Sequence, residues 1–474
     1  MTCHSLLTLA LVTFALQDGL ADIPTDKVDV LPGLTSQPSF KHYSGYLKAT
    51  GTRKLHYWFV ESAGNPKTDP LVVWMNGGPG CSSMDGMLNE HGPFLAAVDG
   101  KTLVNNPYSW NTVANMLYLE APAGVGYSYS VDKNYTTDDD QVSLDNFWAL
   151  KYFIMHFPEY SKNEFFLTGE SYGGIYVPTL AARIVDDKDF NFKWICLQGF
   201  AVGNGLSDWT MNTNSIMFFG YYHGLWGSAL WSKMLSVCCK AAAPLSCNFA
   251  TPTDPQCTAV VMEAGKIINS LNIYNLYSEC YQGPSGDNKT RVLPPSLTAT
   301  RTLTLPAQDT LAKVPQEKLS VVPPCVDVRG ITTYLNRADV RKALHIPAGI
   351  PQWEICSGTV GTSYKMLYKT MRSQYLKILA TKKQRILVYN GDVDMACNFL
   401  GDQWFAESLD QQVVMNRTMW HYKAKDGSKQ VAGFVKHFQN LSVVTVKGSG
   451  HMVPQDKPIP ALKMFTSFIQ GKHY

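Results

Sequence analysis

The chain has 474 residues, of which 45% are hydrophobic and 17% charged, a composition that can build a large core and excludes a disordered protein. The length corresponds to two or three domains, or to one elaborated α/β unit. The formal net charge is +3 without a long run of Lys or Arg, so nucleic acid is not an expected partner.

The N-terminus is expected to be a secretory signal peptide. Leu6 to Leu16 form an apolar run too short to span a bilayer, and Gly19-Leu20-Ala21 ends in a small residue suited to cleavage before Asp22. No Lys or Arg precedes the run, and a buried N-terminal helix is the alternative. We therefore predict a signal peptide over residues 1–21 and no later transmembrane helix, because no later stretch is long and apolar enough.

Short apolar runs then alternate with a helical pattern. Such alternation favours a mostly parallel sheet with helices on both faces. A helix is expected over residues 146–157, and strands are expected over 56–62, 71–75, 116–120, 165–167, 194–200, 385–389 and 441–446.

The strand over 165–167 leads into the pattern Gly169-x-Ser171-x-Gly173, which an apolar segment with helical potential follows. Strand, sharp turn and helix form the context in which this pattern is a nucleophile elbow. A Gly-Ser-Gly turn in a surface loop is the alternative. Ser171 is therefore the candidate nucleophile.

A serine hydroxyl needs a base to take its proton, and in this type of fold an acid and then a histidine follow the serine. The strand over 385–389 runs into Asp392 and Asp394, and the strand over 441–446 runs into His451. Both aspartates are candidates for the acid, and a turn-forming role is the alternative for each. The joint order and the strand-end positions predict a catalytic triad.

The α/β pattern breaks between residues 206 and 325. Helical segments over 215–227 and 260–272 alternate there with polar loops, and six of the eleven cysteines lie there. We interpret 206–325 as a lid inserted into a core of residues 22–205 and 326–474. The stretch 287–316, rich in Thr, Pro and basic residues, is expected to be exposed and to be excised.

Secretion would favour disulfides and glycans. Cys238, Cys239, Cys247 and Cys257 lie close together without a histidine among them, which favours disulfides over a zinc site. The sequence contains four glycosylation sequons, at Asn134, Asn288, Asn416 and Asn440.

Four longer motifs carry a resemblance over almost the whole mature chain: WMNGGPGCSS (74–83), GESYG (169–173), GDVD (391–394) and GHMVP (450–454). Together they resemble the serine carboxypeptidases, and the lid motif NIYNLY (272–277) is similar to that of a lysosomal branch of the family. The resemblance implies an α/β-hydrolase fold with a large, mainly helical, disulfide-stapled lid.

The resemblance also implies roles for single residues. Ser171 would be the nucleophile, His451 the base and Asp394, rather than Asp392, the acid. The backbone N–H groups of Gly78 and Tyr172 would form the oxyanion hole, one donor following the nucleophile and the other lying in a Gly-rich loop.

A carboxypeptidase must hold a free terminal carboxylate. The resemblance assigns this to Asn76, the N–H of Gly77, Glu90 and Glu170. Two close carboxyl groups cannot both ionise cheaply, so the glutamate pair would retain a proton and could donate a hydrogen bond to the substrate. This chemistry suits an acidic compartment.

The disulfides implied by the resemblance are Cys81 with Cys356, Cys238 with Cys257, Cys239 with Cys247, and Cys280 with Cys325. The two remaining cysteines of the mature chain would be thiols, Cys196 in the core and Cys397 close to the substrate.

The resemblance implies a serine-type carboxypeptidase that releases C-terminal residues, preferably hydrophobic ones, at acidic pH through an acyl-enzyme. The expected location is the lysosome, with secretion from the cell as a second destination. No metal or organic cofactor is implied. Near neutral pH, esterase and deamidase activity is expected. The expected partners are peptides with a free C-terminus, a second copy in a homodimer, and lysosomal β-galactosidase and neuraminidase, which the protein would protect. A mainly non-catalytic stabilising partner and an acyltransferase or esterase of the same fold are the alternatives.

Overall fold

The computed structural model describes residues 26–187, 195–239, 246–268, 271–281 and 325–474. The signal peptide expected over 1–21, the stretch 287–316 and Asn288 lie outside these ranges. Within them, no helix is long and apolar enough to cross a membrane.

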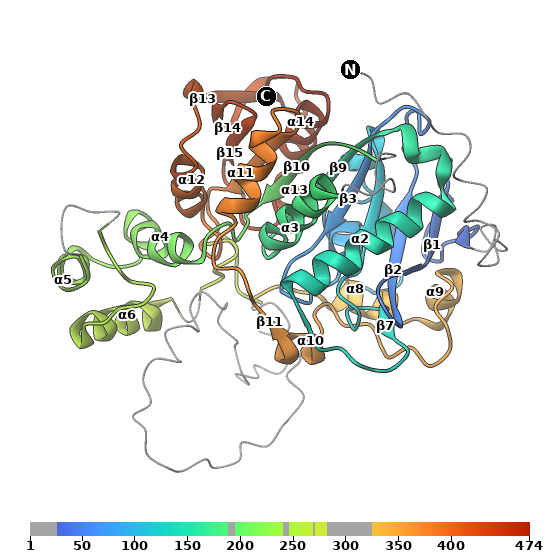
Figure 1. The fold of residues 1–474 in the computed structure, drawn as a ribbon, viewed down its shortest axis with the longest axis horizontal. Helices are drawn as coiled ribbons and strands as arrows, with labels where there is room; N and C mark the ends of the chain where they lie inside the picture. The colour runs from blue at the N-terminus through green and yellow to red at the C-terminus, as the bar shows by residue number, and fades with distance from the viewer. Residues whose placement is uncertain (1–25, 188–194, 240–245, 269–270, 282–324) are drawn as a thin grey trace, which may run out of the picture.

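A large twisted sheet runs through the molecule, with the strand order β1-β2-β6-β3-β9-β10-β12-β15-β14-β13 and the short β7 beside β2 (Figure 1). Its middle, from β6 to β15, is parallel, and the strands toward both edges are antiparallel. The strands are β1 (His42–Lys48), β2 (Arg53–Val60), β3 (Leu71–Met75), β6 (Asn115–Leu119), β7 (Tyr129–Ser130), β9 (Glu164–Glu170), β10 (Cys196–Gly203), β12 (Arg385–Gly391), β13 (Val413–Lys423), β14 (Lys429–Phe438) and β15 (Leu441–Val446). Two short ribbons pair β4 (Phe94–Ala96) with β5 (Leu103–Asn105) and β8 (Thr137–Asp138) with β11 (Tyr364–Lys365).

The central strands are buried on both faces, as their continuous apolar runs require. In β3, Leu71, Val73 and Met75 pack into one hydrophobic core, while Val72 and Trp74 pack into the other. The period of two in side-chain direction thus divides each strand between two cores.

Helices cover both faces. The core that contains Leu71 also holds residues of α2, α3, α11 and α12, and the core that contains Trp74 holds residues of α8, α9 and α14. The core helices are α2 (Asp139–His156), α3 (Gly173–Asp186), α8 (Arg329–Leu335), α9 (Ala338–Ala343), α10 (Gly358–Ser363), α11 (Arg372–Ala380), α12 (Phe399–Ser408), α13 (Val453–Asp456) and α14 (Pro458–Ile469), with the short turns η2 (Gly86–Glu90), η3 (Trp110–Thr112) and η4 (Pro158–Lys162).

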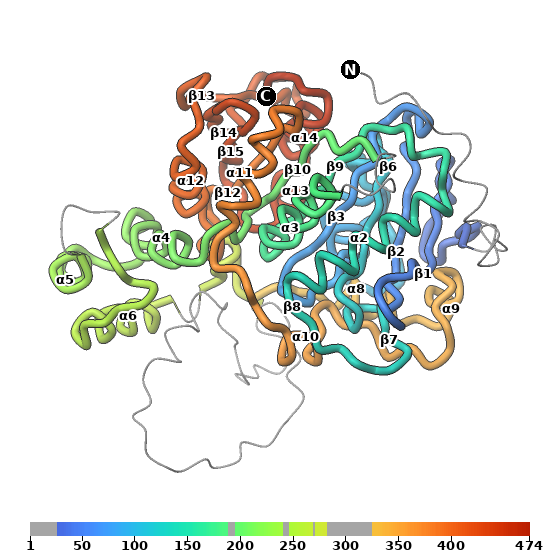
Figure 2. Tube along the Cα trace, in the orientation of Figure 1, coloured from blue at the N-terminus to red at the C-terminus, as the bar shows by residue number. Residues whose placement is uncertain are grey.

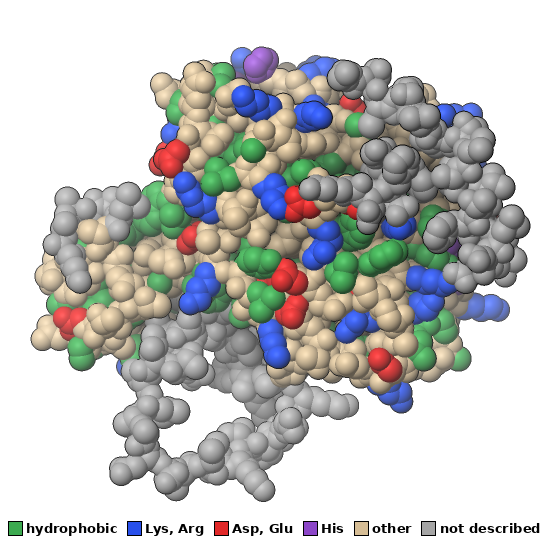
Figure 3. Space-filling view, in the orientation of Figure 1, with side chains coloured by type: hydrophobic (Ala, Val, Ile, Leu, Met, Phe, Trp, Pro, Cys, Tyr) green, Lys and Arg blue, Asp and Glu red, His purple; other side chains and the backbone are tan. Residues whose placement is uncertain are grey.

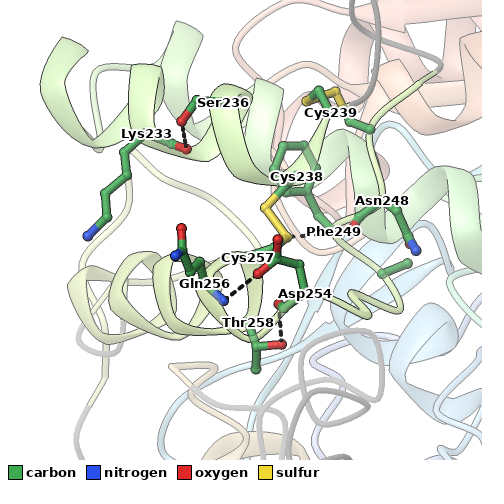
Figure 4. The surroundings of a disulfide bond; sticks show 12 residues. Lys233, Ser236, Cys238, Cys239, Asn248, Phe249, Asp254, Gln256, Cys257 and Thr258 are labelled. Atoms are coloured by element: carbon green, nitrogen blue, oxygen red, sulfur yellow. Dashed lines mark hydrogen bonds between the residues drawn. A yellow bond between two sulfur atoms is a disulfide. The ribbon is translucent and has the colours of Figure 1, made fainter.

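Among the described residues between β10 and α8, three helices project from one side of the sheet (Figure 2): α4 (Trp209–Tyr222), α5 (Ser228–Cys238) and α6 (Pro255–Ile267). They share a hydrophobic cluster of their own, and α4 packs against α12. Cys238 at the end of α5 is bonded to Cys257 in α6 (Figure 4), which fixes the two helices to each other. The expected helical, disulfide-stapled lid is confirmed, while its boundaries at 206 and 325 stay predictions.

The expected elements lie close to the observed ones, and the strands 71–75 and 441–446 match residue for residue. The three helices expected over 146–157, 215–227 and 260–272 begin five to seven residues earlier than expected, at Asp139, Trp209 and Pro255 respectively. In each case the aspartate just before the helix, Asp138, Asp208 or Asp254, caps the first turn. The hairpin of β13 and β14 was not predicted. Most of β13 is exposed at the sheet edge, so its sequence lacks a continuous apolar run.

Charged side chains of both signs are interspersed over the face in Figure 3. This agrees with the small net charge of +3 and shows no basic stripe on that face.

Candidate active site

Ser171 lies on a sharp turn between β9 and α3. Its backbone adopts φ of +59°, a strained conformation for a side chain other than glycine. The Ser171 N–H donates to the carbonyls of Gly203 and Asn204 at 3.0 and 3.2 Å, which ties the turn to the end of β10. The hydroxyl is therefore presented at the carboxyl end of the parallel strands, where α/β proteins bind their ligands.

The glycines around Ser171 are required by close backbone approach. A Cβ on Gly169 would lie 2.5 Å from the carbonyl oxygen of Met75, and one on Gly173 would lie 3.0 Å from the same atom. The end of β3 thus packs directly against the elbow and leaves no room for side chains at Gly169 and Gly173.

His451 and Asp394 lie together at the same edge of the sheet. His451 Nδ1 is 2.7 Å from Asp394 Oδ2, and both side chains are buried. Asp394 also accepts hydrogen bonds from Asn204 Nδ2 and from the N–H groups of Ala396 and Cys397, at 2.8 to 3.2 Å. Because a carboxylate accepts, Nδ1 carries the proton, and Nε2 is left as the basic nitrogen.

Ser171 and His451 line one pocket. In the described part of the chain, no hydrogen bond joins the Ser171 hydroxyl to His451. Such contacts are often long in free enzymes and shorten when substrate binds.

Asp392 has a different environment. Its Oδ1 accepts a hydrogen bond from the Gly448 N–H at 2.6 Å, and burial raises its pKa. It therefore holds the loop that leads to His451, whereas Asp394 contacts the imidazole itself.

Two backbone N–H groups are available beside Ser171. Within the described residues, neither the Gly78 nor the Tyr172 N–H donates to a protein acceptor. Gly78 has φ of +113°, and a Cβ on the adjacent Gly77 would lie 2.3 Å from the Tyr172 nitrogen. The Gly-rich loop after β3 thus touches the first turn of α3, and the two donors lie in one region.

Beside the serine lies a cluster of buried polar side chains. Asn76 Nδ2 donates to Glu170 Oε1 at 2.8 Å and to Glu90 Oε1 at 3.2 Å. Asn76 Oδ1 is held by the Trp74 indole N–H and the Gly86 N–H, which fixes the amide orientation. The second oxygens of both glutamates are buried without a partner among the described residues. The structure thus brings together the residues expected to hold a carboxylate.

A third carboxyl group, which the sequence analysis did not identify, completes the cluster. Asp85 precedes η2 and lines the same pocket, and oxygens of Asp85, Glu90 and Glu170 lie within 4.8 Å of one another. No motif singled it out, because it follows the Gly-rich loop as an ordinary polar residue would. The spacing would also fit a cation, but carboxyl groups that retain protons are poor ligands.

Burial and mutual repulsion make this cluster hold protons. Burial, with the charge of Asp85, raises the pKa of Glu90 to about 8. Burial and the charge of Glu90 raise the pKa of Glu170 well above 4.5. Burial raises the pKa of Asp85 to about 6, against a hydrogen bond from Asn89.

The four cysteine pairs that the resemblance implies are disulfides in the structure. Cys81 with Cys356 links the Gly-rich loop to a residue 275 positions later, at the pocket wall. Cys196 and Cys397 remain thiols. Cys196 is partly exposed rather than in the core, because it is the first residue of β10. Cys397 is buried, and its N–H donates a hydrogen bond to Asp394 Oδ2.

Three sequons lie within the described residues. Asn134 and Asn416 are exposed, and Asn440 lies partly exposed in the turn between β14 and β15. None of the three lines the pocket that contains Ser171.

Comparisons with known proteins point to one family. A family model described as serine carboxypeptidase matches residues 32–471. The chain is 48% identical over 475 aligned positions to the lysosomal protective protein of Mus musculus, covering 99% of this chain and 98% of that protein. It is 44% identical over 462 positions to the serine carboxypeptidase ctsa-4.1 of Caenorhabditis elegans, covering 96% and 95%.

Among solved structures, the chain is similar to Kex1(Δ)p, a prohormone-processing carboxypeptidase from Saccharomyces cerevisiae. The TM-score is 0.73 at 22% identity, with 95% of this chain and 97% of that chain covered. At this identity the likeness concerns the fold, and it confirms the expected α/β-hydrolase architecture.

Proposed function

Since the chain belongs to the serine carboxypeptidase family, we propose that it removes C-terminal residues from peptides at acidic pH, with Ser171, His451 and Asp394 as its catalytic triad. The predicted enzyme class, a serine-type carboxypeptidase, is confirmed by the family match and the relatives. The acidic pH, the substrate preference, the compartment and the residue roles are the parts proposed.

The proposed chemistry follows from the triad geometry. His451 Nε2 takes the Ser171 proton while Oγ attacks the scissile carbonyl, and the N–H groups of Gly78 and Tyr172 stabilise the resulting oxyanion. Asp394, 2.7 Å from Nδ1, holds the imidazole in the productive tautomer and stabilises its cation. The protonated His451 then gives its proton to the leaving amine, and water hydrolyses the acyl-enzyme by the reverse sequence.

The observation that carries the exopeptidase proposal is the Asn76–Glu90–Glu170 cluster in the pocket of Ser171. A protonated carboxyl donates a hydrogen bond, so Glu90 and Glu170 can receive the terminal carboxylate of a peptide, while both amide hydrogens of Asn76 hold the two glutamates in place. An acyltransferase or esterase would have no carboxylate to hold there. A mainly non-catalytic protein would not need the strained Ser171 turn.

The pocket walls favour a hydrophobic leaving residue. Ile355, Met452 and the Cys81–Cys356 disulfide line the pocket beside the polar cluster. Burial of an apolar side chain there is worth about 25 cal/mol per Å² removed from water. We therefore propose a preference for hydrophobic C-terminal residues.

A single assay tests this function: hydrolysis of N-blocked dipeptides with a free or an amidated C-terminus at pH 5 and pH 7.5. Free peptides should be cleaved best at pH 5, while amides and esters should be cleaved well at pH 7.5, which is the proposed deamidase and esterase activity. Equal cleavage of free and amidated peptides at pH 5 would refute the carboxylate-receiving role.

For the compartment, we propose the lysosome, reached through the secretory pathway, with release from the cell as a second destination. The signal peptide expected over 1–21, the sequons and a carboxyl cluster in which Asp85 has a pKa of about 6 support this. The relative named lysosomal protective protein supports a further proposal, that the chain forms a homodimer and protects lysosomal β-galactosidase and neuraminidase. Co-purification from lysosomes, and the half-life of both glycosidases in cells that express Ser171→Ala, would test it apart from catalysis.

We also propose that the stretch 287–316 is excised. Cys280 with Cys325 and Cys81 with Cys356 would keep the two chains joined. Material from lysosomes should give one band without reductant and two bands with it. A single intact chain in fully active, reduced enzyme would contradict this proposal.

A further inference from the structure

A short lid segment lies between the two catalytic loops. Residues Ile273–Leu276, here called the clamp segment, follow α6 and precede Cys280. Ile273 is buried, whereas Tyr274 and Asn275 are partly buried. Its sequence suggested only a family likeness, and the mechanism above does not use it.

The clamp segment is bonded to both neighbours of the acid. The Met395 N–H donates to the Ile273 carbonyl at 2.9 Å, and the Leu276 N–H donates to the Val393 carbonyl at 3.1 Å. Asp394 lies between Met395 and Val393, so its backbone is fixed on both sides by the lid.

The same segment is bonded to the base. The His451 N–H donates to the Tyr274 carbonyl at 2.7 Å, and the Tyr274 ring packs edge-on against the imidazole, with centroids 5.0 Å apart. A Cβ on Gly450 would lie 2.3 Å from the Tyr274 carbonyl oxygen. The close approach of the two backbones thus depends on a glycine next to the histidine.

The side chain of Asp456 also links the clamp segment to the loop of His451. Asp456 Oδ2 accepts hydrogen bonds from the Gly450 N–H at 2.7 Å and from Asn275 Nδ2 at 3.0 Å. Asn275 Oδ1 in turn accepts from the Tyr277 N–H, which fixes the amide. A single carboxylate oxygen therefore joins the loop of the base to the clamp segment.

We propose that the clamp segment positions the catalytic acid and base relative to each other, with Asn275 and Asp456 as positioning residues that act through His451. The inference rests on the proposed triad. The loops of Asp394 and His451 follow different strands, and a displacement of about 1 Å between reacting groups can cost roughly 100-fold in rate. The lid thus contributes to turnover and not only to covering the site.

The disulfide from Cys280 to Cys325 holds the clamp segment to the core. It begins four residues after the clamp segment and returns the chain to the core domain. A cut anywhere between 282 and 324 would leave the clamp segment covalently tied on both sides. Positioning of the triad should therefore survive proteolytic nicking there.

The test uses the full-length secreted protein with Asn275→Ala, Asp456→Ala and Asp456→Asn. We expect kcat for a free-C-terminus peptide to fall about 10-fold or more in both alanine variants, with KM within about 2-fold, because Asn76, Glu90 and Glu170 are untouched. Asp456→Asn should recover most of the activity, because its amide oxygen can still accept from Gly450. The double variant Asn275→Ala/Asp456→Ala should be no slower than Asp456→Ala, because both changes remove the same bond.

Asp254→Ala is the matched control. Its carboxylate also accepts a hydrogen bond from a backbone N–H in the lid, that of Gln256 at 2.7 Å at the start of α6 (Figure 4), but it does not line the pocket of Ser171. It should retain wild-type kcat. The rate at which a fluorophosphonate labels Ser171 should fall with kcat in the alanine variants. If Asp456→Ala does not fold, Asn275→Ala carries the test alone.

Unchanged kcat and labelling in folded Asn275→Ala, or equal impairment of Asp456→Asn and Asp456→Ala, would overturn the proposal. A wild-type protein that labels with the fluorophosphonate but cleaves no peptide would instead contradict the proposed exopeptidase function, and the labelling rates would still test the clamp segment.

Discussion

The steepest pH dependence of peptide binding should come from Asp85. Its pKa of about 6 lies below that of Glu90, about 8, so Asp85 ionises before Glu90 as the pH rises. At pH 5 it is mainly neutral and at pH 7.5 mainly charged. A substrate carboxylate held by Asn76 and the glutamates would then face a new negative charge.

The size of the effect follows from the spacing. Oxygens of the three carboxyl groups lie within 4.8 Å of one another. At an effective dielectric constant of about 20, two unit charges about 5 Å apart repel by about 3 kcal/mol. This corresponds to about 100-fold in binding, and partial exposure of Asp85 reduces it to about 10-fold.

The assay is KM for an N-blocked dipeptide between pH 5 and pH 7.5. We expect KM of the wild type to rise about 10-fold, and KM of Asp85→Asn to stay within about 3-fold over this range, because the amide does not ionise. The same dipeptide with a C-terminal amide is the control, and its KM should be flat for both proteins. An equally steep rise in Asp85→Asn would refute the assignment, and flattening by Glu90→Gln/Glu170→Gln alone would place the titration on the glutamate pair.

Three further predictions address the triad and the stability of the cluster. Ser171→Ala should lower turnover by about 10⁴- to 10⁶-fold without changing the melting temperature, and a purified variant with a tenth of wild-type turnover would disprove the nucleophile. Asp394→Asn should lower kcat by about 10³- to 10⁴-fold, because the amide favours the wrong tautomer of the imidazole. Asp392→Asn should lower kcat far less, and the reverse ranking would show that the acid was misassigned. Because the pKa of Glu90 is raised from 4.5 to about 8, the folded state binds more protons than the unfolded state between these values, so the free energy of unfolding should fall as pH rises through this window. Urea denaturation at pH 5 and pH 7.5 should show that Glu90→Gln/Glu170→Gln reduces this fall, and an unchanged pH slope would count against the raised pKa values.

Much of this protein could be predicted from its sequence. The apolar runs of β3, β9 and β15 and the Gly-x-Ser-x-Gly turn are local patterns, so the α/β class and the nucleophile elbow followed from neighbouring residues. The order of serine, acid and histidine followed from strand ends, since parallel strands bring their carboxyl ends to one edge. The choice between Asp392 and Asp394, however, came from the family resemblance and not from the local pattern.

Only the tertiary structure could show which residues far apart in the sequence contact each other. Asn76 and Glu170 are 94 positions apart, and Asn275 and Asp456 are 181 positions apart. No periodicity of the chain encodes such a meeting. A pKa likewise depends on burial, so the pKa of Asp85 rises only when folding buries part of its carboxyl group, and only in the folded chain does that group lie beside Glu90 and Glu170. Local side-chain pattern determines the elements, whereas the position and charge of each catalytic group are set by long-range packing.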